Sequence, residues 1–296
     1  MKRITSLIAI IGISLLIAAC SKGLLEQGKQ VNYRTGTTGL EVTLLSNMPP
    51  RELPEGSPFR IGVKLQNRGA YDTRRSTVTV AGLSEAWTPL AFDQLQLPPL
   101  KGRSLDAPDG DIYVAEFTGR NIAFPPSVAE YRSPFWVITE YEYETIAQAD
   151  VCISADILEL ESSPGSCKAK GRISLGSQGA PVVVTNVEQV ITPIDNNAMM
   201  VQMAFTVENR GSGELASPLQ LADVRLANRR MDCDTGDAHT RRELTAEDLE
   251  EGSNKVTCTI IEPLQSPYTT TFSVVVDYTY RTITKGAFTI RRRPQR

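Results

Sequence analysis

Two stretches of the sequence match each other without gaps and decide the fold. Residues 135–146 read FWVITEYEYETI, and residues 272–283 read FSVVVDYTYRTI. Both alternate apolar and polar residues, which is the period of a β-strand with one buried face. Both also carry a Tyr-x-Tyr pair, whose side chains share one face of a sheet. The match indicates that one β-rich unit occurs twice in the chain.

A second motif recurs ahead of each of these stretches. A strand with an alternating pattern ends in Asn-Arg-Gly at residues 67–69, and another ends in Asn-Arg-Gly at residues 209–211. Because Asn and Gly accept a positive φ, we expect the strand to end in a turn at each site. The two motifs recur in the same order at nearly the same separation, so duplication of one β domain is the simplest account.

Alternating or β-branched runs, separated by Gly and Pro, continue through both halves. They predict an all-β fold of two tandem antiparallel β-sandwiches. We expect two strands with a turn near Gln148 within residues 135–153, separate strands at 270–280 and 287–291, and a loop-like insert at 84–109. A short helix is expected at 245–251, with Thr245 as its N-cap and Gly252 at its end. The other expected strands are residues 40–44, 59–66, 77–83, 112–117, 182–191, 199–208, 219–226 and 255–261.

The N-terminal segment has the layout of a secretion signal. Lys2 and Arg3 precede an apolar run that ends at Ala19, and polar residues follow Cys20 at once. The small residues before Cys20 resemble the lipobox of bacterial-type lipoproteins, in which that cysteine is acylated and becomes the mature N-terminus. The resemblance implies a lipid anchor at Cys20. A retained membrane helix, for which the run is short, and plain secretion are the alternatives, and all three place the rest of the chain outside the cytoplasm.

These patterns divide the chain into five segments. They are a signal peptide at 1–19, a flexible tether with lipidated Cys20 at 20–39, a first β-sandwich at 40–155, a linker at 156–180 and a second β-sandwich at 181–296. The tether is assigned because it is polar, contains several glycines and has no hydrophobic period.

Each half resembles the immunoglobulin-like modules of cell-surface proteins. A strand followed by Asn-x-Gly is similar to the CARDB group of adhesion-related domains, over residues 40–153 and 181–291. The resemblance implies a β-sandwich used as a spacer, a stalk or a binding module. The cysteines and the insert at 84–109 depart from a minimal module of that kind.

Four cysteines remain besides Cys20. An even set in an exported chain indicates disulfides, and three pairings are open. We favour Cys152–Cys167 and Cys233–Cys258, because each pair then stays within one proposed domain. A zinc site is the competing interpretation, but the sequence has no CxxC and a single histidine.

One polar loop holds the candidates for metal binding and for base catalysis. Asp232, Asp234 and Asp237 are closely spaced oxygen donors that could coordinate calcium, but they do not follow the EF-hand pattern. We favour an acidic turn beside a disulfide. His239 lies in the same loop, without a Gly-x-Ser-x-Gly motif elsewhere, and we interpret it as a solvated residue.

Glu140, Glu142 and Glu144 alternate with the tyrosines of the first repeat. Paired acids are the catalytic groups of glycosidases, but nothing suggests a sugar cleft, so we expect the solvated face of a strand. We expect the repeat tyrosines to be buried with satisfied hydroxyls, the alternative being an aromatic binding face. A ligand site built from loops would instead be lined by Trp87, Trp136 and acidic side chains.

The net charge is −3, which excludes the overall basic field that nucleic-acid binding uses. The basic C-terminus, Arg291–Arg293 with Arg296, either meets anionic lipid headgroups or is a charged tail. No phosphate loop, dinucleotide fingerprint or catalytic set is present, so we predict no cofactor and no enzymatic activity. The sequence predicts a lipid-anchored cell-envelope protein that is a surface spacer or protein-binding module. Alternatives are an accessory subunit of a pilus or secretion complex, docking by a strand edge, and a glycan- or small-molecule-binding sandwich protein.

Overall fold

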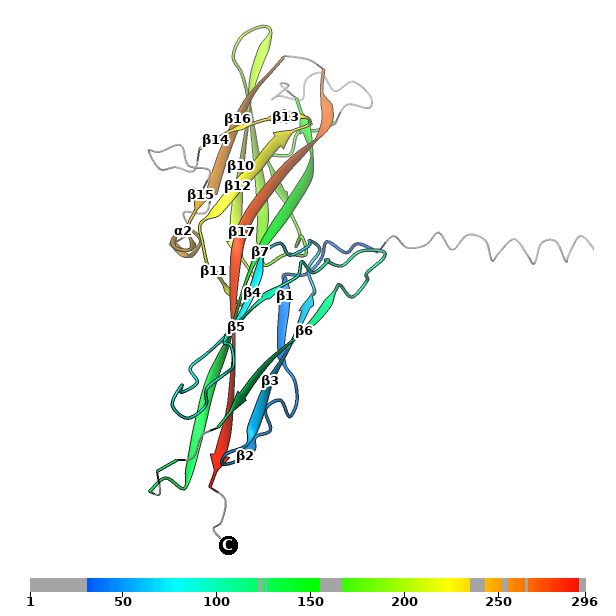
Figure 1. The fold of residues 1–296 in the computed structure, drawn as a ribbon. Coiled ribbons are helices and arrows are strands. Elements are labelled where there is room, and N and C mark those ends of the chain that lie inside the picture. The colour runs from blue at the N-terminus through cyan, green and yellow to red at the C-terminus, as the bar shows by residue number, and fades with distance from the viewer. Residues whose placement is uncertain are drawn as a thin grey trace, which may run out of the picture. The chain divides into compact units, whose positions relative to one another are not determined.

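The chain folds almost entirely into antiparallel strands, which confirms the predicted all-β sandwich class (Figure 1). The computed structural model describes residues 31–121, 124–125, 127–154, 167–234, 243–251, 255–263 and 266–292. Among these residues, helical structure is limited to the short helix α2 (Ala246–Glu251). Residues 33–296 belong to one compact unit.

The described strands of this unit form three sheets. The shared sheet runs β13 (Arg229–Arg230), β12 (Leu219–Leu226), β17 (Tyr268–Arg291), β7 (Glu130–Ile153), β4 (Ser76–Ala81) and β5 (Gln94–Leu97), with β2 (Glu52–Pro54), β11 (Glu214–Leu215) and β15 (Glu243–Leu244) paired at its borders. The first cover sheet runs β1 (Leu40–Leu44), β3 (Pro58–Asn67) and β6 (Ile112–Arg120). The second cover sheet runs β14 (Asp232–Asp234), β16 (Lys255–Pro263), β10 (Ala198–Asn209), β9 (Val182–Pro193) and β8 (Arg172–Ser174).

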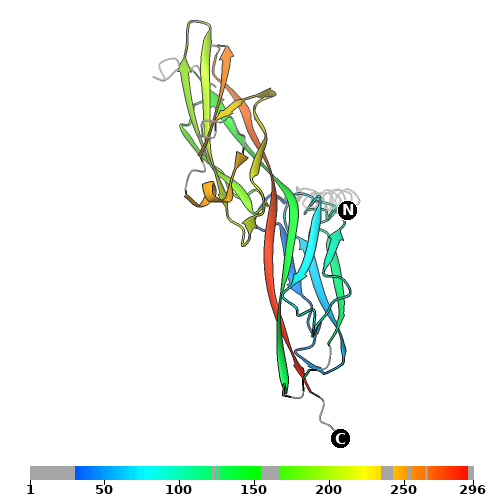
Figure 2. The ribbon, with the colours of Figure 1, turned by 60° about the vertical axis from the view of Figure 1, so that its left-hand side comes forward.

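Each cover sheet packs on a different half of the shared sheet. Phe59 of β3 contacts Phe288 near the end of β17, with ring centroids 5.0 Å apart. Phe205 of β10 contacts Phe272 near the start of β17, with centroids 6.0 Å apart. Figure 2 shows the two cover sheets beside opposite ends of the β7–β17 pair. Buried side chains alternate along these strands, so one face of the shared sheet supplies the core of both sandwiches.

Strands β7 and β17 are each 24 residues long and pair with each other along their whole length. The predicted turn near Gln148 is therefore wrong, because Gln148 lies inside β7, opposite Ser273. Buried Ala147 and Ala149 flank the exposed Gln148, so the period-two pattern carries the strand through this polar residue. The two strands expected within residues 270–291 are likewise one strand.

The repeat and the strand pairing together define a local two-fold relation. The sequence match aligns Tyr141 with Tyr278 and Tyr143 with Tyr280, whereas the pairing places Tyr141 opposite Tyr280 and Tyr143 opposite Tyr278. Both statements hold when the halves are related by a rotation about the residue pair that lies between the tyrosines. The two matching segments of the sequence are thus partners in one antiparallel ladder.

The cover sheets repeat one topology. Strand β3 lies between β1 and β6, and β10 lies between β9 and β16. Leu40 at the start of β1 faces Asn67, and Val182 at the start of β9 faces Asn209. The halves are therefore duplicates in structure as well as in sequence.

The domain boundaries drawn from the sequence stay a prediction. The pairing adds that each long strand serves both sandwiches, since the second half of β17 packs under β3 and the second half of β7 reaches β9. A division at residue 155 would place the second half of β17 in a different domain from the cover sheet that it contacts.

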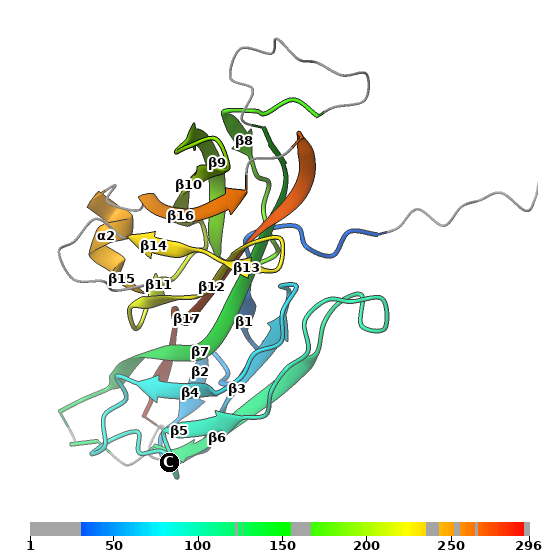
Figure 3. The same ribbon diagram turned by 90° about the horizontal axis from the view of Figure 1, so that it is seen from above.

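The short helix forms as expected. The Thr245 hydroxyl accepts the Asp248 N–H at 3.2 Å, and the Asp248 carboxylate accepts the Thr245 N–H at 2.6 Å, which is a reciprocal N-cap. Gly252, expected to end the helix, lies outside the described residues. Figure 3 shows α2 beside β14 and β15. The expectations did not include the short border strands β2, β5, β8, β11, β13, β14 and β15.

Candidate functional site

The two Tyr-x-Tyr pairs meet at the middle of the β7–β17 pair, on the face that the cover sheets bury. Tyr141, Tyr143, Tyr278 and Tyr280 are each at most 4% exposed. Their rings meet edge to face, with neighbouring centroids 5.6 to 6.3 Å apart. These four residues, here called the tyrosine centre, are therefore packing groups and not an exposed aromatic surface.

The first Asn-Arg-Gly motif holds one of these tyrosines. The Tyr143 hydroxyl accepts the Tyr71 N–H and donates to the Asn67 side-chain oxygen, both at 3.2 Å. The same oxygen accepts the Gly69 N–H at 3.1 Å, and the Asn67 side-chain nitrogen donates to the carbonyls of Tyr71 and Leu100 at 2.8 and 2.9 Å. We call this arrangement the first clasp.

The second Asn-Arg-Gly motif makes the same arrangement, the second clasp. The Tyr280 hydroxyl donates to the Asn209 side-chain oxygen at 2.8 Å and accepts the Gly213 N–H at 2.9 Å. That oxygen also accepts the Gly211 N–H at 3.1 Å, and the Asn209 side-chain nitrogen donates to the Gly213 carbonyl at 2.8 Å. Each clasp ties the end of a cover strand to the middle of the shared sheet.

The two motifs end their strands as predicted, but the expected positive φ is wrong. Neither the two asparagines nor the glycines of the motifs, Gly69 and Gly211, have a φ in the left-handed region. Each asparagine accepts the N–H two residues on, which makes an Asx-turn. Glycine is needed for close approach, because a Cβ on Gly69 would lie 1.9 Å from the Tyr143 hydroxyl and one on Gly211 would lie 2.3 Å from the Tyr280 hydroxyl.

Burial governs the acid–base behaviour of the tyrosine centre. Loss of solvation raises the pKa of Tyr141, Tyr143, Tyr278 and Tyr280 above the usual 10.0, and their hydrogen bonds offset this only in part. The hydroxyls therefore stay protonated at neutral pH, which does not suit them to general acid–base catalysis there.

The three glutamates of the first repeat lie on the opposite, solvated face of β7. Glu140 pairs with Arg281 and Glu142 pairs with Arg75, each at 2.6 Å. Glu144 lies on the same face, further along the strand. Partly exposed ion pairs of this kind contribute at most about 1 kcal/mol each. The glutamates thus form part of an ion-pair network and not a pair of acids facing a cleft.

A hollow of about 170 Å³ opens on this outer face. Arg74 and Asp277, joined at 2.6 Å, line it together with Glu142 and with Ser217 and Pro218 from the turn before β12. Its charged groups are already in ion pairs, Arg74 with Asp277 and Glu142 with Arg75, so they offer few unmatched contacts to a ligand.

A second hollow, of about 190 Å³, lies on the inner side next to the tyrosine centre, and we call it the inner hollow. Beside it, the Thr282 hydroxyl oxygen is buried and has no hydrogen-bond partner among the described residues, and the same holds for Thr139, directly opposite on β7. The polar side chains that line the inner hollow belong to Thr37, Thr38, Tyr141, Arg210, Ser212, Tyr280 and Thr282.

The structure joins Cys152 to Cys167 and Cys233 to Cys258, which is the pairing favoured from the sequence. Cys152 lies near the end of β7. Cys233 of β14 lies directly opposite Cys258 of β16, so this bond fastens a border strand to the second cover sheet. Both disulfides are typical of proteins in oxidising compartments.

The structure describes two of the three candidate calcium ligands. Asp232 and Asp234 flank Cys233 on β14 and are exposed, while Asp237 lies outside the described residues. No group of three or more His, Cys, Asp or Glu side chains that could hold a metal ion occurs in the described ranges.

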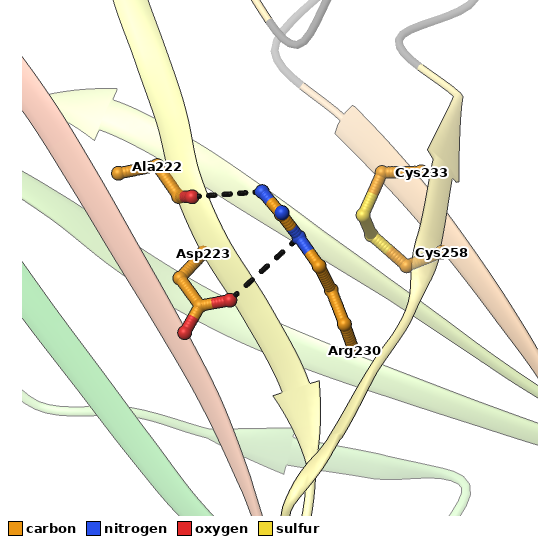
Figure 4. The surroundings of a disulfide bond; sticks show 5 residues. All are labelled: Ala222, Asp223, Arg230, Cys233 and Cys258. Atoms are coloured by element: carbon orange, nitrogen blue, oxygen red, sulfur yellow. Dashed lines mark hydrogen bonds and ion pairs between the residues drawn. A yellow bond between two sulfur atoms is a disulfide. The ribbon is translucent and has the colours of Figure 1, made fainter.

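Figure 4 shows Arg230 beside the disulfide of Cys233 and Cys258, and the Arg230 guanidinium lies 3.8 Å from the Asp223 carboxylate.

The two tryptophans do not line either hollow. Trp87 packs edge to face against Phe124 and Tyr131, with ring centroids 5.6 and 4.7 Å away. Trp136 lies on the outer face of β7 over Gly82 and is 37% exposed. The proposed ligand pocket with both tryptophans and acids is therefore not a feature of the two hollows.

Cys20, the apolar N-terminal run and His239 lie outside the described residues. In the described part of the chain, no helix is both long enough and apolar enough to cross a membrane.

Sequence reasoning missed the clasps and the inner hollow. The sequence revealed both motifs of each clasp, but it did not reveal the contact between them. The joint recurrence of Asn-Arg-Gly and Tyr-x-Tyr is the signal that could have linked them, because two motifs that recur together are candidates for a contact. Thr145 and Thr282 align in the repeat, yet nothing in the sequence distinguishes their surroundings.

No family model matches this sequence, and no curated protein matches it. Solved structures give distant likenesses. The C-terminal globular domain of an oligosaccharyltransferase from Pyrococcus abyssi is 8% identical, with a TM-score of 0.22 and coverage of 86% of this chain and 48% of that chain. Escherichia coli alpha-2-macroglobulin activated by porcine elastase is 11% identical, with a TM-score of 0.16 and coverage of 90% and 23%. The chain thus spans about half and about a quarter of those proteins, and likenesses of this size carry no argument.

Proposed function

We propose that this protein is a non-enzymatic component of the cell envelope, anchored by acyl chains on Cys20, whose body is a stiff spacer that holds a binding surface away from the membrane. The observation that carries the proposal is the unbroken pairing of β7 with β17, 24 residues on each strand. Bending between the two sandwiches would break backbone hydrogen bonds of the shared sheet, and each such bond is costly to lose when buried.

The compartment is supported by two features of different kind. The small residues before Cys20 fit an acylation signal, and two disulfides suit an oxidising environment. More than one acyl chain is needed for a firm hold on a membrane, at about 0.8 kcal/mol per buried CH₂.

The anchor is tested by mass spectrometry of the mature N-terminus. We expect an acylated Cys20 as the first residue, and membrane fractionation of the wild-type protein. Cys20→Ala should leave the protein unacylated and shift it out of the membrane fraction. An unmodified Cys20 in protein purified from native membranes would refute the anchor.

The spacer is tested by pulsed electron resonance between spin labels on the two cover sheets. Thr118 of β6 and Val190 of β9 are exposed, and the remaining cysteines of the body are in disulfides, so cysteines introduced at these sites label selectively. We expect one narrow distance distribution, as narrow as that of a control pair within a single cover sheet. A broad distribution would show a hinge and remove the basis of the spacer.

A second candidate function, docking of a partner strand, is favoured by the outer edge of β6. The Ala91 N–H donates to the Thr118 carbonyl at 2.9 Å on this edge. Because backbone groups alternate in direction along an antiparallel strand, the N–H and C=O of Ile112, Val114 and Glu116 point to the same edge. No described strand pairs with them there.

The second half of the molecule shows how the corresponding edge is covered. Strand β16 is paired along its outer edge by β14, antiparallel and fastened by the disulfide. On β6, Ile112 is 52% exposed and Val114 is 46% exposed. An extended segment of a partner protein would add to β6 in the same antiparallel sense, with these apolar side chains giving specificity.

Proline at position 114 tests this docking. Val114→Pro removes an N–H that points away from β3, so the sheet is retained while the edge can no longer donate. Val114→Thr keeps the N–H and is the matched control. We expect a partner that co-purifies with the wild type and with Val114→Thr to be lost with Val114→Pro. A partner retained by all three forms, or the absence of any co-purifying partner, would refute docking at the outer edge of β6.

A further inference from the structure

The two duplicated halves differ in the hydrogen bonds made by one pair of equivalent threonines. Thr145 of β7 aligns with Thr282 of β17. The Thr145 hydroxyl donates to the Val182 carbonyl at 2.7 Å and lies 3.0 Å from the Tyr278 hydroxyl. Thr145 is fully buried, and both hydrogen-bond partners of its hydroxyl belong to the protein itself.

The same contacts are not made in the other half. The equivalents of Val182 and Tyr278 are Leu40 and Tyr141, and there the Leu40 N–H donates to the Tyr141 hydroxyl at 3.2 Å. The Thr282 oxygen is buried without a partner among the described residues. A buried hydroxyl left unpaired destabilises the fold, so such a group calls for an explanation.

A loop closes the equivalent position in one half only. The Ala70 N–H donates to the Gly179 carbonyl at 2.8 Å, and Ala180 is fully buried. The equivalents of Ala70 and Ala180 are Ser212 and Thr38, which are exposed at the rim of the inner hollow. The inner hollow therefore occupies a place that the protein fills with its own backbone in the other half.

The lining indicates the ligand chemistry. The polar side chains of the inner hollow are hydroxyls and one guanidinium, and no acidic side chain lines it. Arg210 uses its Nε to bond Glu208 at 2.9 Å, and its guanidinium carries further N–H donors. Hydroxyl and guanidinium donors suit a carboxylate, and bonds from a guanidinium to an ionised oxygen are stronger than neutral ones.

We propose that the inner hollow binds a small organic carboxylate, with Arg210 contacting the carboxylate group and with Ser212 donating to the ligand's oxygens. The inner hollow has a volume of about 190 Å³ and opens to solvent at its rim. It has room for a single sugar acid or a short aliphatic acid. The site is independent of the anchor and of the spacer.

Calorimetric titration of the purified protein with glucuronate, succinate and glucose tests the proposal. Glucose is the uncharged counterpart of glucuronate. We expect a carboxylate probe to bind and glucose not to bind. Arg210→Gln should weaken the binding by about tenfold or more, since it removes a charged hydrogen bond. Ser212→Trp, at an exposed rim position, should abolish binding by filling the inner hollow.

The duplicated half supplies the control. Arg68→Gln removes the equivalent arginine and should leave binding unchanged. Thr282→Val should leave Tm unchanged, because no partner is lost, whereas Thr145→Val should lower Tm. Failure of both carboxylates to bind at millimolar concentration, equal binding of glucose, or binding unchanged in Arg210→Gln and Ser212→Trp would each overturn the proposal, and none of these outcomes bears on Cys20 or on the rigidity of the body.

Discussion

Tyr143 and Tyr280 occupy equivalent positions, yet the asparagines that they hold differ in burial. Asn67 is 0% exposed, whereas Asn209 is exposed to solvent. Tyr143→Phe leaves buried groups without a partner, and we expect it to lower the free energy of unfolding by about 2 kcal/mol. Tyr280→Phe should lower it by about 1 kcal/mol or less, because water can replace the hydroxyl. Urea unfolding of both variants measures the difference, and equal losses would contradict the asymmetry of the clasps.

The buried tyrosines also set the response of stability to high pH. The folded-state pKa of Tyr141, Tyr143, Tyr278 and Tyr280 is raised above the ordinary 10.0, chiefly by burial. Below pH 10 these groups are protonated in both states and the stability is unaffected. Above pH 10 the unfolded state loses protons that the folded state keeps, so stability falls as pH rises. We expect the four to ionise only with unfolding, as a cooperative step in tyrosinate absorbance; a gradual rise while the fold persists would argue against their burial.

The residues of the clasps show how far the sequence alone could go. Tyr-x-Tyr alternation predicted that the tyrosines share a buried face, because strand periodicity is local information. The reason given for the Asn-Arg-Gly turns was wrong, because the glycines serve the close approach of tyrosines that lie more than 60 residues away in the chain. Contacts of that range leave no trace in local propensity.

At the scale of single elements, β14 is a border strand that pairs with β16 over three residues and is joined to it by one disulfide. Replacing Cys233 and Cys258 by alanine should lower the free energy of unfolding by about 3 kcal/mol on the chain-entropy account. It should also speed amide hydrogen exchange along β14, since only three residues pair there. The Cys152→Ala, Cys167→Ala variant is the control, with a similar loss of stability and unchanged exchange in β14. Unchanged exchange in the first variant would show that the strand holds without its disulfide.

The long strands are the elements that the sequence divided wrongly. The sequence predicted two strands with a turn near the polar Gln148, whereas β7 has 24 residues and is longer than the roughly 3 to 10 residues usual for strands in globular proteins. The run continues because β7 and β17 cover each other throughout, and each half of each strand has a cover sheet to pack against. That support comes from tertiary structure, which explains why the longer strands of the cover sheets were predicted at the right places and the strand lengths in the shared sheet were not.

At the scale of the whole molecule, the duplicated halves exchange strand ends. The second half of β17 packs with the first cover sheet, and the second half of β7 packs with the second. Each half thus completes the core of the other, in the way that two copies of one unit complete each other in a strand-exchanged dimer. The local two-fold relation between β7 and β17 is what such a pairing requires.

This arrangement predicts the behaviour of an isolated half. A fragment of residues 33–154 lacks β17, so its β7 has no partner, and its nearest substitute is β7 of a second copy. Because Tyr280 is equivalent to Tyr143, we expect a symmetric dimer with Tyr141 of each copy opposite Tyr143 of the other. Sedimentation equilibrium gives the mass, and co-expression with residues 167–292 should divert the fragment into a one-to-one complex. A fragment that unfolds cooperatively as a monomer would show that the first sandwich closes without the exchanged strand, and the shared sheet would then be an accessory to two independent domains.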